Sequence, residues 1–114
     1  MLPSESRKYL WDALQAAERV MRFTSEATYD AYRDNEVLRS AVERQFEILG
    51  EALGQLFRRD RETAARIPDL NRIVAFRNVL AHSYDTVDDE VVWGLLESRL
   101  PELKATLQRL LGES

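Results

Sequence analysis

The fold of this chain is decided by residues 36–58, EVLRSAVERQFEILGEALGQLFR. Apolar side chains recur along this stretch at steps of three and four residues, the spacing of one face of an α-helix. Ile48 and Phe57 widen the stripe beyond one contact surface. A stripe this broad predicts a helix that packs on two sides, either at the centre of a bundle or between a core and a second subunit. The stripe consists of Val37, Leu38, Ala41, Val42, Gln45, Phe46, Leu49, Ala52, Leu53 and Leu56.

The residues before this stretch predict one long helix and one short one. Residues 5–24 form an apolar stripe with Trp11 beside it, and Ser4 is the expected N-cap. Residues 25–35 lose the periodicity, and Tyr29 and Tyr32 suit a short helical turn that pins this connection to the body. Asp34 or Asn35 is expected to cap the helix that follows. The apolar stripe consists of Leu10, Leu14, Ala17, Val20 and Met21.

The residues after the stretch predict two further long helices. Residues 60–69 allow one loose helical turn, and a third long helix runs over 70–82 with Asp69 as a possible N-cap. A fourth begins at Thr86 or Asp88, is interrupted or restarted at Pro101, and stops at Gly112. No segment alternates with period two, so no sheet is expected. The predicted fold is all-α: an antiparallel bundle of four main helices with short extra turns, with residues 1–114 as one domain.

The composition excludes several classes of protein. A net charge of −4 argues against a non-specific nucleic-acid coat. Cysteine is absent, which excludes disulfides and fits a reducing cytoplasm, the expected location. No apolar run is long enough to span a membrane. Fourteen of the sixteen basic residues are arginine, and six of these lie at positions 58–77. Most of this cluster suits ordinary surface pairing, but Arg77 has a second interpretation.

Arg77 belongs to the octapeptide RNVLAHSY, residues 77–84, which holds the only histidine of the chain. Arginine, histidine and tyrosine stand there in the pattern R-x4-H-x-Y. Metal-free RNA cleavage needs a base for the 2′-hydroxyl, a cation for the phosphate, and an acid for the leaving 5′-oxygen. Histidine titrates near neutral pH and arginine suits phosphate, so Arg77 and His82 are the candidate catalytic residues. This chemistry favours RNA over DNA, which lacks the 2′-hydroxyl.

Helix geometry limits how these side chains can meet. On an ideal helix, residue 84 lies nearly on the face of residue 77, whereas residue 82 is displaced from it by about 140°. Either the helix ends near His82, or the site is composite, with groups from a second copy. In a two-fold dimer, two copies of His82 could supply both the acid and the base.

Each of these residues also has a structural interpretation. His82 could be a cation at a helix C-terminus, and Arg77 could form an ion pair with Asp85 or Glu51. Asn78 and Glu51 could support the site or be solvated surface residues, and Tyr84 could be a packing residue. One histidine and no cysteine argue against a zinc site, and residues 88–90 look like a helix start. No metal and no cofactor are therefore expected.

The octapeptide resembles the R-x4-H-x-Y motif of HepT-like toxins in the HEPN superfamily. Residues 41–52, AVERQFEILGEA, are similar to the second-helix signature of that family, and residues 91–93 and 100–103 also fit it. The resemblance implies an all-helical homodimer that acts as an endoribonuclease, with Arg77 and His82 catalytic and Asn78 supporting. It also implies an MntA-like nucleotidyltransferase antitoxin that attaches AMP to Tyr84 and thereby neutralises the toxin.

A second hypothesis is a non-catalytic helical module. In that case the octapeptide would dock the nucleotidyltransferase or bind nucleotide, as the broad stripe of residues 36–58 would allow. Dimers that bind such a partner tightly but never cut RNA would favour this hypothesis. A small nucleotidyltransferase encoded in the neighbouring reading frame would support the toxin pairing.

Overall fold

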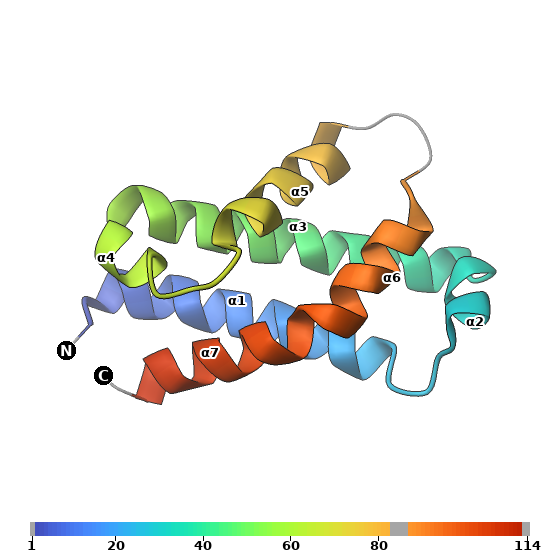
Figure 1. The fold of residues 1–114 in the computed structure, drawn as a ribbon, viewed down its shortest axis with the longest axis horizontal. Helices are drawn as coiled ribbons and strands as arrows, with labels where there is room; N and C mark the ends of the chain where they lie inside the picture. The colour runs from blue at the N-terminus through green and yellow to red at the C-terminus, as the bar shows by residue number, and fades with distance from the viewer. Residues whose placement is uncertain (1, 83–86, 113–114) are drawn as a thin grey trace.

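The computed structural model describes residues 2–82 and 87–112, and within these ranges it contains helices and no strand (Figure 1). The order is α1 (Ser4–Phe23), α2 (Tyr29–Arg33), α3 (Glu36–Arg59), α4 (Arg61–Ala64), α5 (Leu70–His82), α6 (Asp89–Ser98) and α7 (Leu100–Gly112). The predicted all-α fold is therefore confirmed. A helix break separates α6 from α7, so the four main helices of the prediction appear only when these two count as one interrupted helix.

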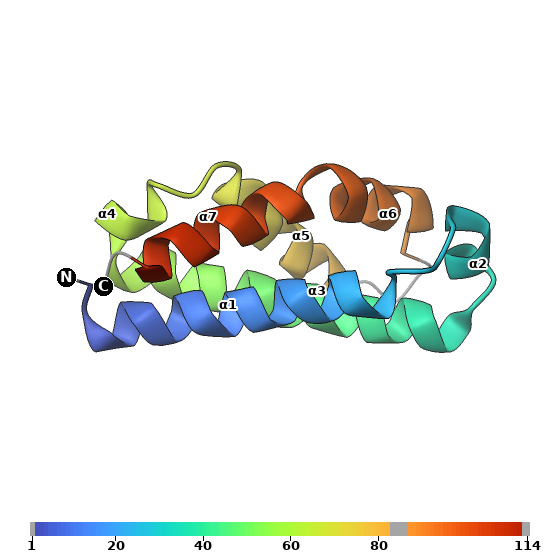
Figure 2. The ribbon, with the colours of Figure 1, turned by 90° about the horizontal axis from the view of Figure 1, so that it is seen from below.

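The long helices α1 and α3 run antiparallel and form the layer on which the rest is built. In Figure 2 they lie together along the molecule, with α4 to α7 on one side of them. Helix α7 packs on α1, and α5 packs on α3. At 24 residues, α3 is about 36 Å long, so it spans most of the 44 Å length of the molecule.

The core lies between the α1–α3 layer and the helices that cover it. Most of its large, fully buried side chains come from α1, α3 and α7, and each contributes about 1.5–3 kcal/mol by its removal from water. The stripe of α3 is narrower than predicted at its start, because Val37 is 80% exposed. The fully buried side chains of these helices include Leu10 and Val20 of α1, Val42, Leu49, Leu53 and Leu56 of α3, and Leu107 and Leu110 of α7.

Two of the predicted helix starts are confirmed in atomic detail, and one is wrong. The Asn35 side chain accepts a hydrogen bond of 3.0 Å from the backbone N–H of Leu38 at the start of α3. Asp88 caps α6 in the same way. Ser4 is not a cap: it is the first residue of α1, and the preceding residue is Pro3, whose carbonyl accepts from the N–H of Arg7. No helix within the described ranges is long and apolar enough to cross a membrane.

Candidate active site

Gly50 determines how closely α5 approaches α3. A Cβ atom at this position would lie 2.2 Å from the Arg77 Cβ and 2.8 Å from its Cγ. It would also lie 3.3 Å from the backbone oxygen of Ile73. The two distances to Arg77 are far inside van der Waals contact, so only glycine permits the crossing. Ile73 and Leu80 bury the apolar face of α5, and this burial holds Arg77 directly over Gly50.

Arg77 is held by polar contacts on two sides of its guanidinium. Its Nη2 lies 3.3 Å from Oε2 of Glu51, and its Nη1 donates a hydrogen bond of 3.2 Å to the side-chain oxygen of Asn78. The Nε atom is buried without a hydrogen-bond partner in the described part of the chain. The side chain is 31% exposed. Arg77 is therefore oriented by α3, and its partly exposed side chain lines a cavity where a phosphate could bind it.

Glu51 connects Arg77 to the next residues of α3. Besides the contact with Arg77, its Oε1 accepts a hydrogen bond of 3.2 Å from Gln55, and it lies 3.9 Å from Nη2 of Arg58. The expected ion pair between Arg77 and Glu51 is thus present. The Glu51 side chain is 49% exposed, and its carboxylate orients the guanidinium of Arg77.

A cavity of about 320 Å³ opens beside this ion pair, between α1 and α3. Trp11, Asp12 and Gln15 line it from α1, and Trp11 is 53% exposed although it is large and apolar. Glu51 and Arg77 lie at the same cavity. The sequence pattern placed Trp11 beside the core stripe, but it carried no sign that α1 contributes to the surroundings of Arg77.

The remaining predicted site residues fall at or beyond the end of α5. The helix includes His82 as its last residue, in agreement with the predicted range of 70–82. Tyr84 and Asp85 lie outside the described residues, so the expectations for them stand as predictions. The described residues contain no cluster of three or more His, Cys, Asp or Glu side chains able to hold a metal ion. Arg77, Asn78 and Glu51 are brought together.

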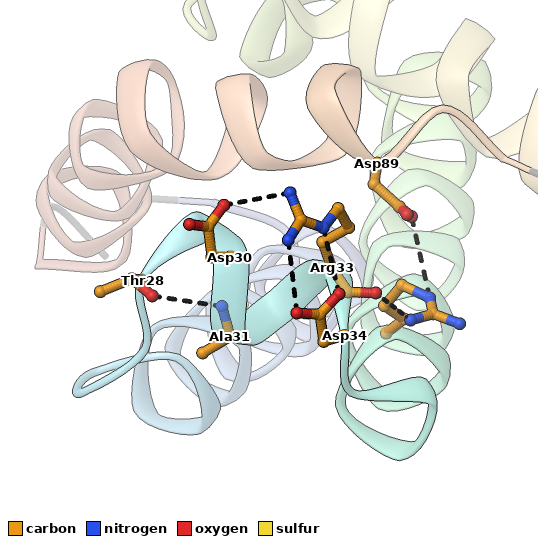
Figure 3. Close-up of polar contacts among 7 residues, drawn as sticks. Thr28, Asp30, Ala31, Arg33, Asp34 and Asp89 are labelled. Carbon is orange, nitrogen blue, oxygen red and sulfur yellow. Dashed lines mark hydrogen bonds and ion pairs between the residues drawn. The ribbon is translucent and has the colours of Figure 1, made fainter.

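Helix α6 begins at Asp89, whose carboxylate forms an ion pair with α3 (Figure 3). Nε of Arg39 lies 3.9 Å from Asp89, and in Figure 3 Arg33 reaches both Asp30 and Asp34. Helix α6 also packs on α2, where the ring centroids of Trp93 and Tyr32 lie 5.3 Å apart. Burial raises the pKa of the Tyr32 hydroxyl, and the nearby Glu43 carboxylate adds to the rise. The short helical turn predicted around Tyr29 and Tyr32 is therefore an anchor for α6.

Comparison with known proteins identifies relatives along almost the whole chain. A family model described as "Ribonuclease HepT-like" matches residues 13–110, which include Gly50, Glu51 and Arg77. A candidate RNase of Methanocaldococcus jannaschii is 30% identical over 108 residues, covering 95% of this chain and 98% of that protein. A probable ribonuclease HepT of Thermococcus cleftensis is 29% identical over 104 residues, covering 91% and 94%. No solved structure matches the chain significantly.

Proposed function

Because this chain belongs to the HepT-like ribonuclease family and is an endoribonuclease by that membership, we propose that it cuts RNA without a metal ion, using Arg77 and His82. The observation that carries the proposal is the placement of Arg77. Its stem lies against Gly50, Glu51 and Asn78 orient its guanidinium, and its side chain is 31% exposed. It lies on the helix that includes His82.

The proposed reaction is a transesterification, in which phosphorus gains a bond to the 2′-oxygen and loses its bond to the 5′-oxygen. His82 of one subunit removes the proton of a 2′-hydroxyl, and the 2′-oxygen forms a bond to phosphorus. The bond from phosphorus to the 5′-oxygen breaks, and an imidazolium returns a proton to that oxygen. Arg77 binds the non-bridging oxygens and stabilises their added charge. The products are a 2′,3′-cyclic phosphate and a 5′-hydroxyl.

The chain has one histidine, and the reaction needs both a base and an acid. We therefore propose a homodimer in which two copies of His82 face one composite cleft. In each subunit Glu51 and Asn78 hold the catalytic arginine, which makes them positioning residues. The whole chain, residues 1–114, acts as one domain in this proposal, and its place of action is the cytoplasm.

The proposed biological role is that of a toxin neutralised by modification. A partner nucleotidyltransferase of the MntA type attaches AMP to Tyr84, seven residues after Arg77 along the chain. Each added phosphate brings negative charge and strong acceptor oxygens. These would occupy Arg77 and repel the substrate phosphate. Mass spectrometry of the protein co-produced with its partner should find AMP on Tyr84, and an unmodified Tyr84 beside active partner and ATP would contradict this part.

The experiment that tests the cleavage chemistry uses RNA in the presence of a chelator. Purified protein should cut a single-stranded RNA in excess EDTA and leave cyclic phosphate ends. A matched oligonucleotide with one 2′-deoxy nucleotide at the cut position should stay intact at that position. Loss of cleavage in EDTA with recovery on adding Mg²⁺, or cleavage of the deoxy linkage, would overturn the proposed mechanism.

A further inference from the structure

A second groove lies where α3, α4 and α5 meet, away from the cavity beside Arg77. We call it the corner groove, and it is lined on its rim by Phe57, Arg61 and Arg72. Its volume is about 510 Å³, and Ile67 and Leu70 contribute buried apolar surface to its floor. Neither the core of the bundle nor the proposed reaction uses these rim side chains.

The rim of the corner groove combines a partly exposed aromatic ring with positively charged side chains. Phe57 is 36% exposed, and the guanidinium carbon of Arg61 lies 4.9 Å from its ring centroid. Within the described part of the chain, Arg61 and Arg72 form no ion pair. The acidic residue of the lining, Asp69, is neutralised because its carboxylate lies 2.9 Å from Nη1 of Arg99. The groove therefore presents positive charge around an aromatic face.

The corner groove is connected to Arg77 along the seam between α3 and α5. A Cβ on Gly54 would lie 3.6 Å from Nη1 of Arg58 and 3.8 Å from Cγ1 of Val74, so the Arg58 side chain lies along this seam. Arg58 also reaches to within 3.9 Å of Glu51, the partner of Arg77. Phe57 follows Gly50 by seven residues, which is about 10 Å along the helix axis. Guanidinium groups thus run from the corner groove to the proposed catalytic arginine.

We propose that the corner groove binds the single-stranded RNA on one side of the phosphate that is cut. A base stacks on Phe57, and Arg61 and Arg72 contact backbone phosphates. Stacking rings within a positively charged groove are the general means by which proteins hold single strands. The occupant is a single strand, because a base inside a duplex cannot offer its face to Phe57. The inference rests on the proposed function and adds where the substrate strand lies.

These contacts are made with base faces and with phosphates, and neither kind of contact involves the 2′-hydroxyl. Single-stranded DNA of the same sequence should therefore bind the corner groove and compete with RNA, although it is not cut. This separates the role of the groove, which is binding, from that of Arg77 and His82, which is chemistry.

The test measures RNA binding by fluorescence anisotropy in a His82→Ala background, which leaves the RNA intact. The probe is a labelled, unstructured RNA of about 12 nucleotides. Phe57→Ala should weaken binding roughly 5- to 100-fold, with little change in salt dependence. Arg61→Ala with Arg72→Ala should weaken it and make the slope of log K against log salt shallower by about 1.4, the value for two lost phosphate contacts.

The chain offers a matched control. Arg22 and Phe23 form a similar exposed pair at the end of α1, with the guanidinium carbon 6.0 Å from the ring centroid. Arg22→Ala with Phe23→Ala should leave both affinity and slope unchanged. Phe57→Trp should keep binding and Phe57→Leu should lose it, since leucine preserves apolar packing but offers no ring. Circular dichroism checks that each variant is folded.

Wild-type affinity in Phe57→Ala or in the double arginine variant would overturn the inference. Variants that lose the dimer or the partner but keep wild-type RNA affinity would also overturn the inference. Binding is measured without cleavage, so the result does not depend on the reaction. A wild-type protein that cuts no RNA but loses RNA binding on these changes would refute the proposed function alone.

Discussion

At the scale of single residues, the position of Arg77 depends on a residue without a side chain. Gly50 lets the stem of Arg77 lie against α3, and Glu51, the next residue, receives its guanidinium. The sequence offered Glu51 as one of two ion-pair partners for Arg77. It could not predict that Gly50 brings them together, because the crossing point of two helices is a property of their packing.

Replacing Gly50 by alanine should therefore displace Arg77. The added methyl group overpacks the crossing and should lower the free energy of unfolding by about 1–3 kcal/mol, because α5 must move away. RNA cleavage should fall more than stability does. Gly94, where an added Cβ would meet no atom within 4 Å, is the matched control, and Gly94→Ala should be neutral or stabilising by up to about 1 kcal/mol. Equal effects of both changes in urea unfolding would contradict this account.

Glu51→Gln separates positioning from stability. The side chain is 49% exposed, and exposed ion pairs contribute little, so unfolding should change by less than about 1 kcal/mol. Cleavage should fall by up to about 100-fold, because Arg77 loses the charge that orients it. The fall should appear in kcat more than in KM. Arg33 forms an exposed pair with Asp30 outside the lining of the cavity beside Arg77, so Asp30→Asn serves as the control. Unchanged kcat in Glu51→Gln would remove Glu51 from the site.

At the scale of elements, one carboxylate joins three helices. Asp60 lies between α3 and α4, and it accepts a hydrogen bond of 2.7 Å from the Ser6 hydroxyl of α1. It also accepts from the backbone N–H and hydroxyl of Thr63 in α4. These bonds, that from Ser6 foremost, lower the pKa of Asp60 below its ordinary value of 3.8. Ser6 and Asp60 are 54 residues apart, so the hydrogen bond between them could not be predicted from local sequence.

This lowered pKa gives stability a defined pH dependence. A carboxyl with a depressed pKa in the folded state stabilises it above the unfolded pKa, and the contribution is lost as pH falls through the folded pKa. The wild type should therefore lose stability below about pH 4. Ser6→Ala and Asp60→Asn should each reduce that acid-dependent part, and the double variant should add little. Urea unfolding near neutral and acid pH measures it, and strict additivity of the two changes would contradict the coupling.

The ends of the helices were the features that could best be predicted from the sequence. Periodicity and caps placed α3 and α5 within a residue of their ends, because buried stripes and capping side chains are local signals. The inclusion of Val37 in the packed stripe of α3 was wrong. Val37 satisfies the helical spacing, yet it lies at the start of α3, and in the described structure its side chain remains 80% exposed. The grooves at Arg77 and Phe57 were not predicted, since each is assembled from several helices.

At the scale of the whole molecule, a net charge of −4 coexists with a local run of guanidinium groups along the α3–α5 seam. The seam can bind a phosphate chain where the molecule as a whole repels it. The proposed dimer brings two such seams to one cleft. The argument for a dimer comes from the sequence, because a single histidine cannot be the acid and the base at the same time.

Mixing subunits tests the shared cleft. If both copies of His82 serve one reaction, wild-type protein re-equilibrated with excess His82→Ala protein should keep an activity proportional to the square of the wild-type fraction. Two independent sites would keep an activity directly proportional to that fraction. Arg109→Ala, a change at an exposed arginine of α7, supplies the mixing control and should leave activity unchanged. A linear loss would contradict the composite cleft and leave the chemistry of each subunit in place.

The central claim is that Arg77 and His82 together break the RNA backbone. It is tested most directly by measuring single-turnover RNA cleavage in EDTA for the wild type, Arg77→Ala, His82→Ala and Arg109→Ala, each checked for folding by circular dichroism. The account predicts that the first two substitutions each lower the rate by about 100-fold or more and that Arg109→Ala cuts like the wild type. Cleavage at the wild-type rate by folded Arg77→Ala or His82→Ala protein would contradict it.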